Sequence, residues 1–229
     1  LVNNTDAFDV AEDELLNDGT VVIYREAGHQ DKRWLGKFAH GYLRIIFEAA
    51  EKSGFEKEIC ILPTCNHYSE YFGMREQMLI KYGQPISAKP YYELYKAKPR
   101  TAQRQLNTIV WRQISDMMLN VTDLNSYDAI DYLRNTYGIR YAKAKGLDPD
   151  RLPQKLVADK QLFAELDTLK TAGAEQVQAL YNNVSKLEKE TELLKIKDND
   201  FDKKNNVAVM LLQGLLFIAL FPLFVFACI

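Results

Sequence analysis

The sequence segment best suited to chemistry is the polar stretch from Tyr24 to Arg33, which follows an apolar, β-branched run and contains a glycine. Arg25, Lys32 and Arg33 supply positive charge around it. Loops beyond the carboxyl ends of strands in open α/β sheets bind ligands, and backbone amides at a helix start suit an anion such as phosphate. The spacing alone also fits a solvated, charged loop, so both interpretations stay open.

A second candidate is the segment Cys65-Asn66-His67, which places a nucleophile close to a base. Adjacent placement argues against catalysis, because nucleophile and base usually come from distant segments. Cys60 and Cys65 are more simply interpreted as small buried residues around a strand. The three histidines lack the spacing of a metal site, so none is predicted.

The elements that would position these residues alternate between helix and strand over residues 1–119. Apolar periodicity predicts helices at residues 6–17, 38–52 and 101–119, and β-branched runs predict strands at residues 20–24, 58–64 and 78–82. This alternation is typical of an α/β fold.

Residues 120–205 are strand-poor, and they predict a helical hairpin or coiled-coil linker with helices at residues 123–145 and 154–197. Residues 206–229 are expected to form a transmembrane helix. Their uncharged run, residues 207–229, would span roughly 35 Å against a hydrocarbon core of about 30 Å. Lys203 and Lys204 before it favour a membrane protein with its soluble part on the cytoplasmic side.

Composition restricts the class of protein. The 229 residues carry 29 basic and 31 acidic side chains, a net charge of -2, which argues against a general nucleic-acid binder. Three cysteines do not make a disulfide framework. A local cationic cluster nevertheless occurs between residues 89 and 112. It fits either a solvated helix face or a patch that contacts anionic lipid headgroups. Its members are Lys89, Lys96, Lys98, Arg100, Arg104 and Arg112.

Four short blocks follow one another along residues 24–86. They are Tyr-Arg-Glu-Ala-Gly-His at residues 24–29, Phe-Ala-His-Gly at 38–41, Ile-Cys-Ile-Leu-Pro-Thr at 59–64 and Gly-Gln-Pro at 83–85. Their order resembles the glycerolipid acyltransferases that acylate glycerol-3-phosphate and 1-acylglycerol-3-phosphate. The family counterparts are Phe-Pro-Glu-Gly-Thr-Arg, Phe-Lys-x-Gly, a strand with Val-Pro-Val, and Gly-x-Pro. The resemblance covers about residues 1–119 and implies the C-terminal half of an acyltransferase α/β domain.

The resemblance implies transfer of a fatty acyl group from a coenzyme A or acyl-carrier-protein thioester to glycerol-3-phosphate or lysophosphatidate, with membrane lipids as partners and no further cofactor. Arg25 and Ala27 depart from the family pattern, and His29 stands where the family has Arg. The implied substrate-binding residues are Glu26 and Gly28 at the glycerol-phosphate site, His29, Lys32 and Arg33 near the phosphate, and Pro63 at the floor of the cleft.

The family base, a His followed five residues later by Asp, is missing. Trp34, Ile45 and Phe72 stand five residues after the three histidines. In the family this motif precedes the first of the four blocks, so we expect it upstream of Leu1, and the chain as given is predicted to be an inactive enzyme fragment. The alternative is a non-enzymatic, membrane-anchored scaffold that binds partners through its helical segment, residues 123–197.

Overall fold

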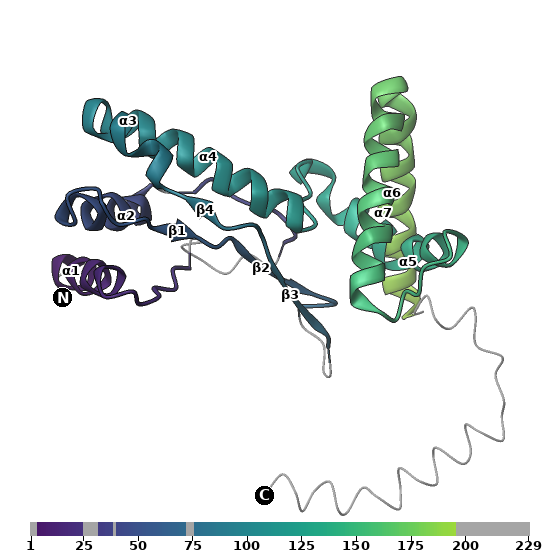
Figure 1. The fold of residues 1–229 in the computed structure, drawn as a ribbon. Helices are drawn as coiled ribbons and strands as arrows, with labels where there is room; N and C mark the ends of the chain where they lie inside the picture. The colour runs from purple at the N-terminus through teal and green to yellow at the C-terminus, as the bar shows by residue number, and fades with distance from the viewer. Residues whose placement is uncertain (1–3, 25–31, 39, 72–75, 196–229) are drawn as a thin grey trace, which may run out of the picture. The chain divides into compact units, whose positions relative to one another are not determined.

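The computed structural model describes residues 4–24, 32–38, 40–71 and 76–195 (Figure 1). Helices make up 64 % of this part of the chain. The chain divides into two compact units, residues 1–181 and 182–229. The α-helices are α1 (Asn4–Leu16), α2 (Gly41–Lys52), α3 (Tyr92–Ala97), α4 (Pro99–Met117), α5 (Tyr127–Ala144), α6 (Leu152–Ala172) and α7 (Ala174–Leu194), and the short 3-10 helices are η1 (Lys89–Tyr91) and η2 (Leu124–Ser126).

Helix α2 is the centre of the first core. Its apolar residues recur every three or four positions, so Leu43, Ile46, Phe47 and Ala50 share one buried face. The ring of Phe47 stacks on Tyr95 of α3 with 4.2 Å between centroids. Helices α1 and α2 lie side by side, and α3 and α4 pack on the same core (Figure 1). Ile59 before β1 and Ala88 after β4 belong to the same core, so these helices fix the position of the β1–β4 pair.

The strands form two antiparallel pairs. Strand β1 (Cys60–Ile61) pairs with β4 (Ile86–Ser87), and β2 (Thr64–Tyr68) pairs with β3 (Met78–Tyr82). Within the second pair Cys65 lies opposite Lys81, and His67 lies opposite Leu79. Cys65 and His67 are both buried, because side chains two residues apart point to the same face of a strand.

The predicted α/β class is therefore wrong: the described chain is predominantly helical, with only two small antiparallel sheets. An α/β sheet alternates strands with helices, whereas β2 ends at Tyr68 and β3 begins at Met78 with nine residues between them. Residues 20–24 have no regular secondary structure, and the expected strand at residues 58–64 is interrupted at Pro63, which has no amide hydrogen to donate to a ladder.

The predicted transmembrane helix is corrected as well. Among the described residues no helix is both long and apolar enough to cross a bilayer. The last described helix, α7, ends at Leu194. The apolar run 207–229, from which the transmembrane helix was predicted, lies outside the described residues.

Helices α5 and α6 form the second core, and Tyr141, Ala142, Ala158, Leu162 and Leu166 pack together within it. The predicted single helix at residues 154–197 is interrupted at Gly173, where α6 ends and α7 begins. Gly138 of α5 is buried and lies next to α6. A Cβ atom at this position would stand 3.0 Å from Lys155 Nζ and 3.3 Å from Asp159 Oδ1. The glycine allows two charged side chains of α6 to reach the backbone of α5.

We expect Gly138→Ala to lower the free energy of unfolding by about 1 kcal/mol, because overpacking against a buried ion pair outweighs the gain in helix propensity. Gly41→Ala is the matched control. Nothing lies within 4 Å of the added methyl group at this first residue of α2, so its stability should stay equal or rise. Urea denaturation of both variants measures the difference, and a stabilised Gly138→Ala variant would contradict the close contact.

Candidate functional site

The sequence-predicted substrate-binding residues lie only partly within the described chain. Glu26, Gly28 and His29 fall outside it, whereas Lys32, Arg33 and Pro63 are described. Lys32 is exposed, and its ammonium group lies 4.9 Å from the centroid of the Tyr127 ring. The cation of Lys32 is therefore held at the surface by an aromatic face but is still open to a phosphate group.

Arg33 has a different environment, because its side chain is only 2 % exposed. Its Nη1 donates to the carbonyl oxygen of Tyr68 and its Nη2 to that of Ser69, both at 2.9 Å. Its Nε lies 3.5 Å from the carboxylate of Asp131, and its backbone amide donates to the Tyr127 hydroxyl at 2.7 Å. The guanidinium of Arg33 thus connects the end of the polar stretch 24–33 to the end of β2 and to α5.

Burial raises the pKa of the Tyr127 hydroxyl, and the hydrogen bond from the Arg33 amide opposes that shift. Tyr127 therefore stays protonated and neutral at physiological pH. Its ring lies near the Lys32 cation while its hydroxyl accepts from the backbone amide of Arg33, so one residue of α5 contacts two consecutive residues of this segment.

Pro63 is buried between β1 and β2. Its carbonyl oxygen accepts a hydrogen bond from the amide of Gly83 at 2.8 Å. Two of the four blocks, Ile-Cys-Ile-Leu-Pro-Thr and Gly-Gln-Pro, are therefore in direct contact although about twenty residues separate them in the sequence.

The β2–β3 pair has one exposed face with apolar character. Met78, Ile80 and Tyr82 alternate along β3 and are 52 %, 42 % and 65 % exposed. Thr64 and Asn66 lie opposite Tyr82 and Ile80 on β2 and are exposed too. Exposed apolar side chains that adjoin one another mark surfaces that bind apolar groups.

The opposite face of β2 carries His67, which is 5 % exposed. Burial and, to a smaller extent, four nearby cations together lower the pKa of its imidazole to about 3. A histidine with so low a pKa is neutral at pH 7 and is a weak base. Cys65 is buried on the same face of β2, whereas Cys60 is exposed, contrary to the expectation that both are buried.

A cavity of about 240 Å³ adjoins His67. Its lining residues come from the β2–β3 hairpin, from α5 and from the start of α6, and they are His67, Ser69, Glu76, Gln77, Arg134, Asn135, Ile139, Pro149, Asp150, Leu152, Lys155 and Asp159. The sequence interpretation missed all of them except His67. The signal was present as Lys155 and Asp159, an oppositely charged pair at i and i+4 on a helix, but such pairs are usually solvent-exposed.

Three charged groups at the floor of this cavity are nearly inaccessible to solvent: Arg134 is 4 %, Lys155 9 % and Asp159 1 % exposed. Lys155 Nζ donates to the carboxylate of Asp159 and, at 3.3 Å, to the carbonyl oxygen of Arg134. Burial lowers the pKa of the Lys155 ammonium, and Asp159 opposes that shift. For Arg134, burial also lowers the pKa, but Asp131 and Asp159 outweigh it, so the net shift is upward.

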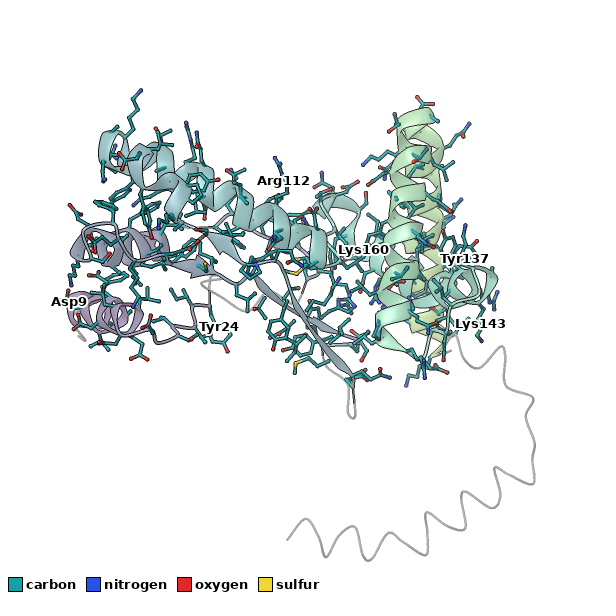
Figure 2. The ribbon with its side chains drawn as sticks, viewed as in Figure 1. Asp9, Tyr24, Arg112, Tyr137, Lys143 and Lys160 are labelled. Atoms are coloured by element: carbon teal, nitrogen blue, oxygen red, sulfur yellow. The ribbon has the colours of Figure 1, made fainter. Side chains whose placement is uncertain are left out.

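The cationic cluster between residues 89 and 112 is exposed at all six positions, including Arg112 on α4 (Figure 2). Lys96 forms an ion pair with Glu93 at 2.6 Å. Both predicted interpretations, a solvated face and a surface for anionic headgroups, require this exposure.

Among the described residues no group of three or more His, Cys, Asp or Glu side chains could hold a metal ion.

Comparison of the chain with protein-family models, curated proteins and solved structures finds no match.

Proposed function

We propose that this chain contributes to the transfer of a fatty acyl group from a thioester, carried by coenzyme A or an acyl carrier protein, to glycerol-3-phosphate or its monoacyl ester. The observation that carries the proposal is the hydrogen bond between Pro63 and Gly83. It joins two of the four blocks through which the sequence resembles glycerolipid acyltransferases. The bond continues the β2–β3 ladder beyond the pair Thr64–Tyr82, so both blocks lie at the same end of one hairpin.

The acceptor phosphate would bind next to Lys32. This side chain is exposed, and among the described residues its cation lies against the Tyr127 ring and not against a carboxylate. An ammonium group that is not paired with an acidic side chain is well suited to a phosphate. Arg33 would act as a positioning residue, because its guanidinium already donates to Tyr68 and Ser69.

The acyl chain would lie on the exposed apolar side chains of Met78, Ile80 and Tyr82. Anionic lipid headgroups would contact the exposed cations between residues 89 and 112. Both surfaces fit an enzyme whose substrates are amphipathic.

The catalytic base would come from elsewhere than the described histidines. His40 is exposed at the start of α2, with Ile45 where the family motif needs Asp. His67 is neutral and has a pKa of about 3, so it cannot draw a proton from an alcohol efficiently. We therefore expect this 229-residue chain to bind the acceptor without cleaving the thioester.

Calorimetric titration of the chain with glycerol-3-phosphate tests the proposal, with glycerol as the neutral control. Lys32→Gln should weaken binding about tenfold, the loss expected for one charge-assisted hydrogen bond. Lys37→Gln is the matched control, because Lys37 is also exposed and the charge change is the same. Equal binding of glycerol and glycerol-3-phosphate, or an unaffected Lys32→Gln variant, would overturn the phosphate site.

Thioester cleavage gives the second measurement. The chain should bind palmitoyl coenzyme A without releasing free thiol from it when glycerol-3-phosphate is added. Absence of any binding of palmitoyl coenzyme A would favour the scaffold alternative. One observation already favours it: Leu187, Leu193 and Leu194 of α7 are 51 %, 83 % and 64 % exposed, as expected of a helix that binds a partner.

A further inference from the structure

The cavity next to His67 contains an unsatisfied hydrogen-bond donor. Arg134 Nε donates to Asp131 at 2.8 Å, and Nη1 lies 3.5 Å from the carboxylate of Asp159. Arg134 Nη2 is buried and has no hydrogen-bond partner among the described residues. Because nearly all buried polar groups in proteins are hydrogen-bonded, this nitrogen, on a side chain that lines the cavity, indicates a missing acceptor.

The buried charges at the floor of the cavity favour an acceptor with a single negative charge. Arg134 and Lys155 supply two buried cations there, against the one buried carboxylate of Asp159. His67 is neutral, so these buried groups carry one excess positive charge. One bound monoanion would compensate it.

The rim of the cavity discriminates between classes of anion. Glu76 and Asp150 line it and are exposed. Their negative charges would repel a phosphate monoester, which carries a charge of about −1.5 to −2 at pH 7, more than a monocarboxylate. The planar guanidinium of Arg134 also matches the geometry of a carboxylate.

The remaining lining is partly apolar. Ile139 of α5, Pro149 of the α5–α6 connection and Leu152 of α6 face the same cavity. These side chains would cover a short hydrocarbon body. A volume of about 240 Å³ is below the range of roughly 300–1,000 Å³ that drug-sized ligands occupy, so the ligand must be small.

We propose that the cavity between the β2–β3 hairpin, α5 and α6 is a binding site for a short-chain aliphatic carboxylate, whose oxygen accepts a hydrogen bond from Arg134 Nη2. The site is separate from the loop at Lys32 and does not rest on the proposed acyl transfer. It would give the helical part of this compact unit a ligand of its own.

Titration of the 15N-labelled chain with butyrate, followed by NMR at constant ionic strength, tests the site. Butyrate should shift the signals of Arg134 Nε and the His67 ring saturably, with a dissociation constant of about 1 mM. Butyramide has the same shape without the charge and should bind at least tenfold more weakly. Inorganic phosphate should bind more weakly than butyrate.

Three variants separate binding from folding. Arg134→Lys keeps the positive charge but removes Nη2, and should weaken butyrate binding at least tenfold. Ile139→Trp fills the cavity without changing any charge and should abolish binding, which keeps the test valid if Arg134→Lys unfolds. Lys143→Gln removes an exposed cation of the same helix (Figure 2) and should leave binding unchanged.

Equal shifts from butyrate and butyramide, or unchanged butyrate binding by Ile139→Trp, would overturn the site. Lys32→Gln should leave butyrate binding intact. A failure of the glycerol-3-phosphate experiment and a failure of this one are therefore distinguishable.

Discussion

Replacement of Asp159 by asparagine is expected to lower the free energy of unfolding by about 3 kcal/mol. The carboxylate is 1 % exposed and is the partner of both Lys155 and Arg134. Removing one member of a buried ion pair leaves the other charge desolvated and uncompensated, which typically costs 3–5 kcal/mol. Urea denaturation at pH 7, followed by far-UV circular dichroism, measures the change.

Asp167→Asn is the control for this substitution. Asp167 lies on the same helix α6 but is exposed, so its stability should change by no more than about 0.5 kcal/mol. A second comparison uses Lys155→Met. The Lys155→Met variant already lacks one of the two buried cations that Asp159 compensates. Asp159→Asn should therefore lower the unfolding free energy clearly less in this variant than in the wild-type chain. Equal costs in both backgrounds would show that the two side chains are not coupled.

The sequence was most informative about individual elements. The alternation of residues 78–82 matches β3, and the periodicity of residues 38–52 predicts α2, which begins at Gly41 and not at Phe38. Local patterns of this kind depend only on which face of an element is buried. The pairing of the strands depends on contacts between distant segments, and for this reason the α/β class was wrong.

The candidate site shows the same limit. The sequence predicts Arg33 as a phosphate ligand because it ends a polar loop. In the structure its guanidinium donates instead to the carbonyl oxygens of residues 68 and 69. Nothing local to Arg33 indicates these acceptors. Lys155 and Asp159 likewise have the spacing of an exposed helical pair. Their burial follows from Gly138 on the neighbouring helix, which allows the two charges to approach.

The stability of the chain should fall as the pH is lowered from about 6.5 towards 3, and His67 should account for a large part of the fall. Its pKa is lowered from 6.5 to about 3 by burial first and then by the cations Arg33, Arg134, Lys81 and Lys160. In this interval the unfolded chain binds a proton that the folded chain does not, so protonation favours unfolding. At pH 4.5 the contribution of His67 amounts to a loss of about 2 to 3 kcal/mol relative to pH 7.

His67→Gln separates this contribution from that of the carboxylates, because glutamine does not titrate. The difference in unfolding free energy between the wild-type chain and this variant should be constant above pH 7. As the pH falls through 6 and 5, the wild-type chain should lose unfolding free energy relative to the variant. His40→Gln changes an exposed histidine and should leave the pH dependence of the wild type intact. Parallel curves for the wild type and His67→Gln would mean that the imidazole titrates near its ordinary pKa and that the cavity is open enough to hydrate it.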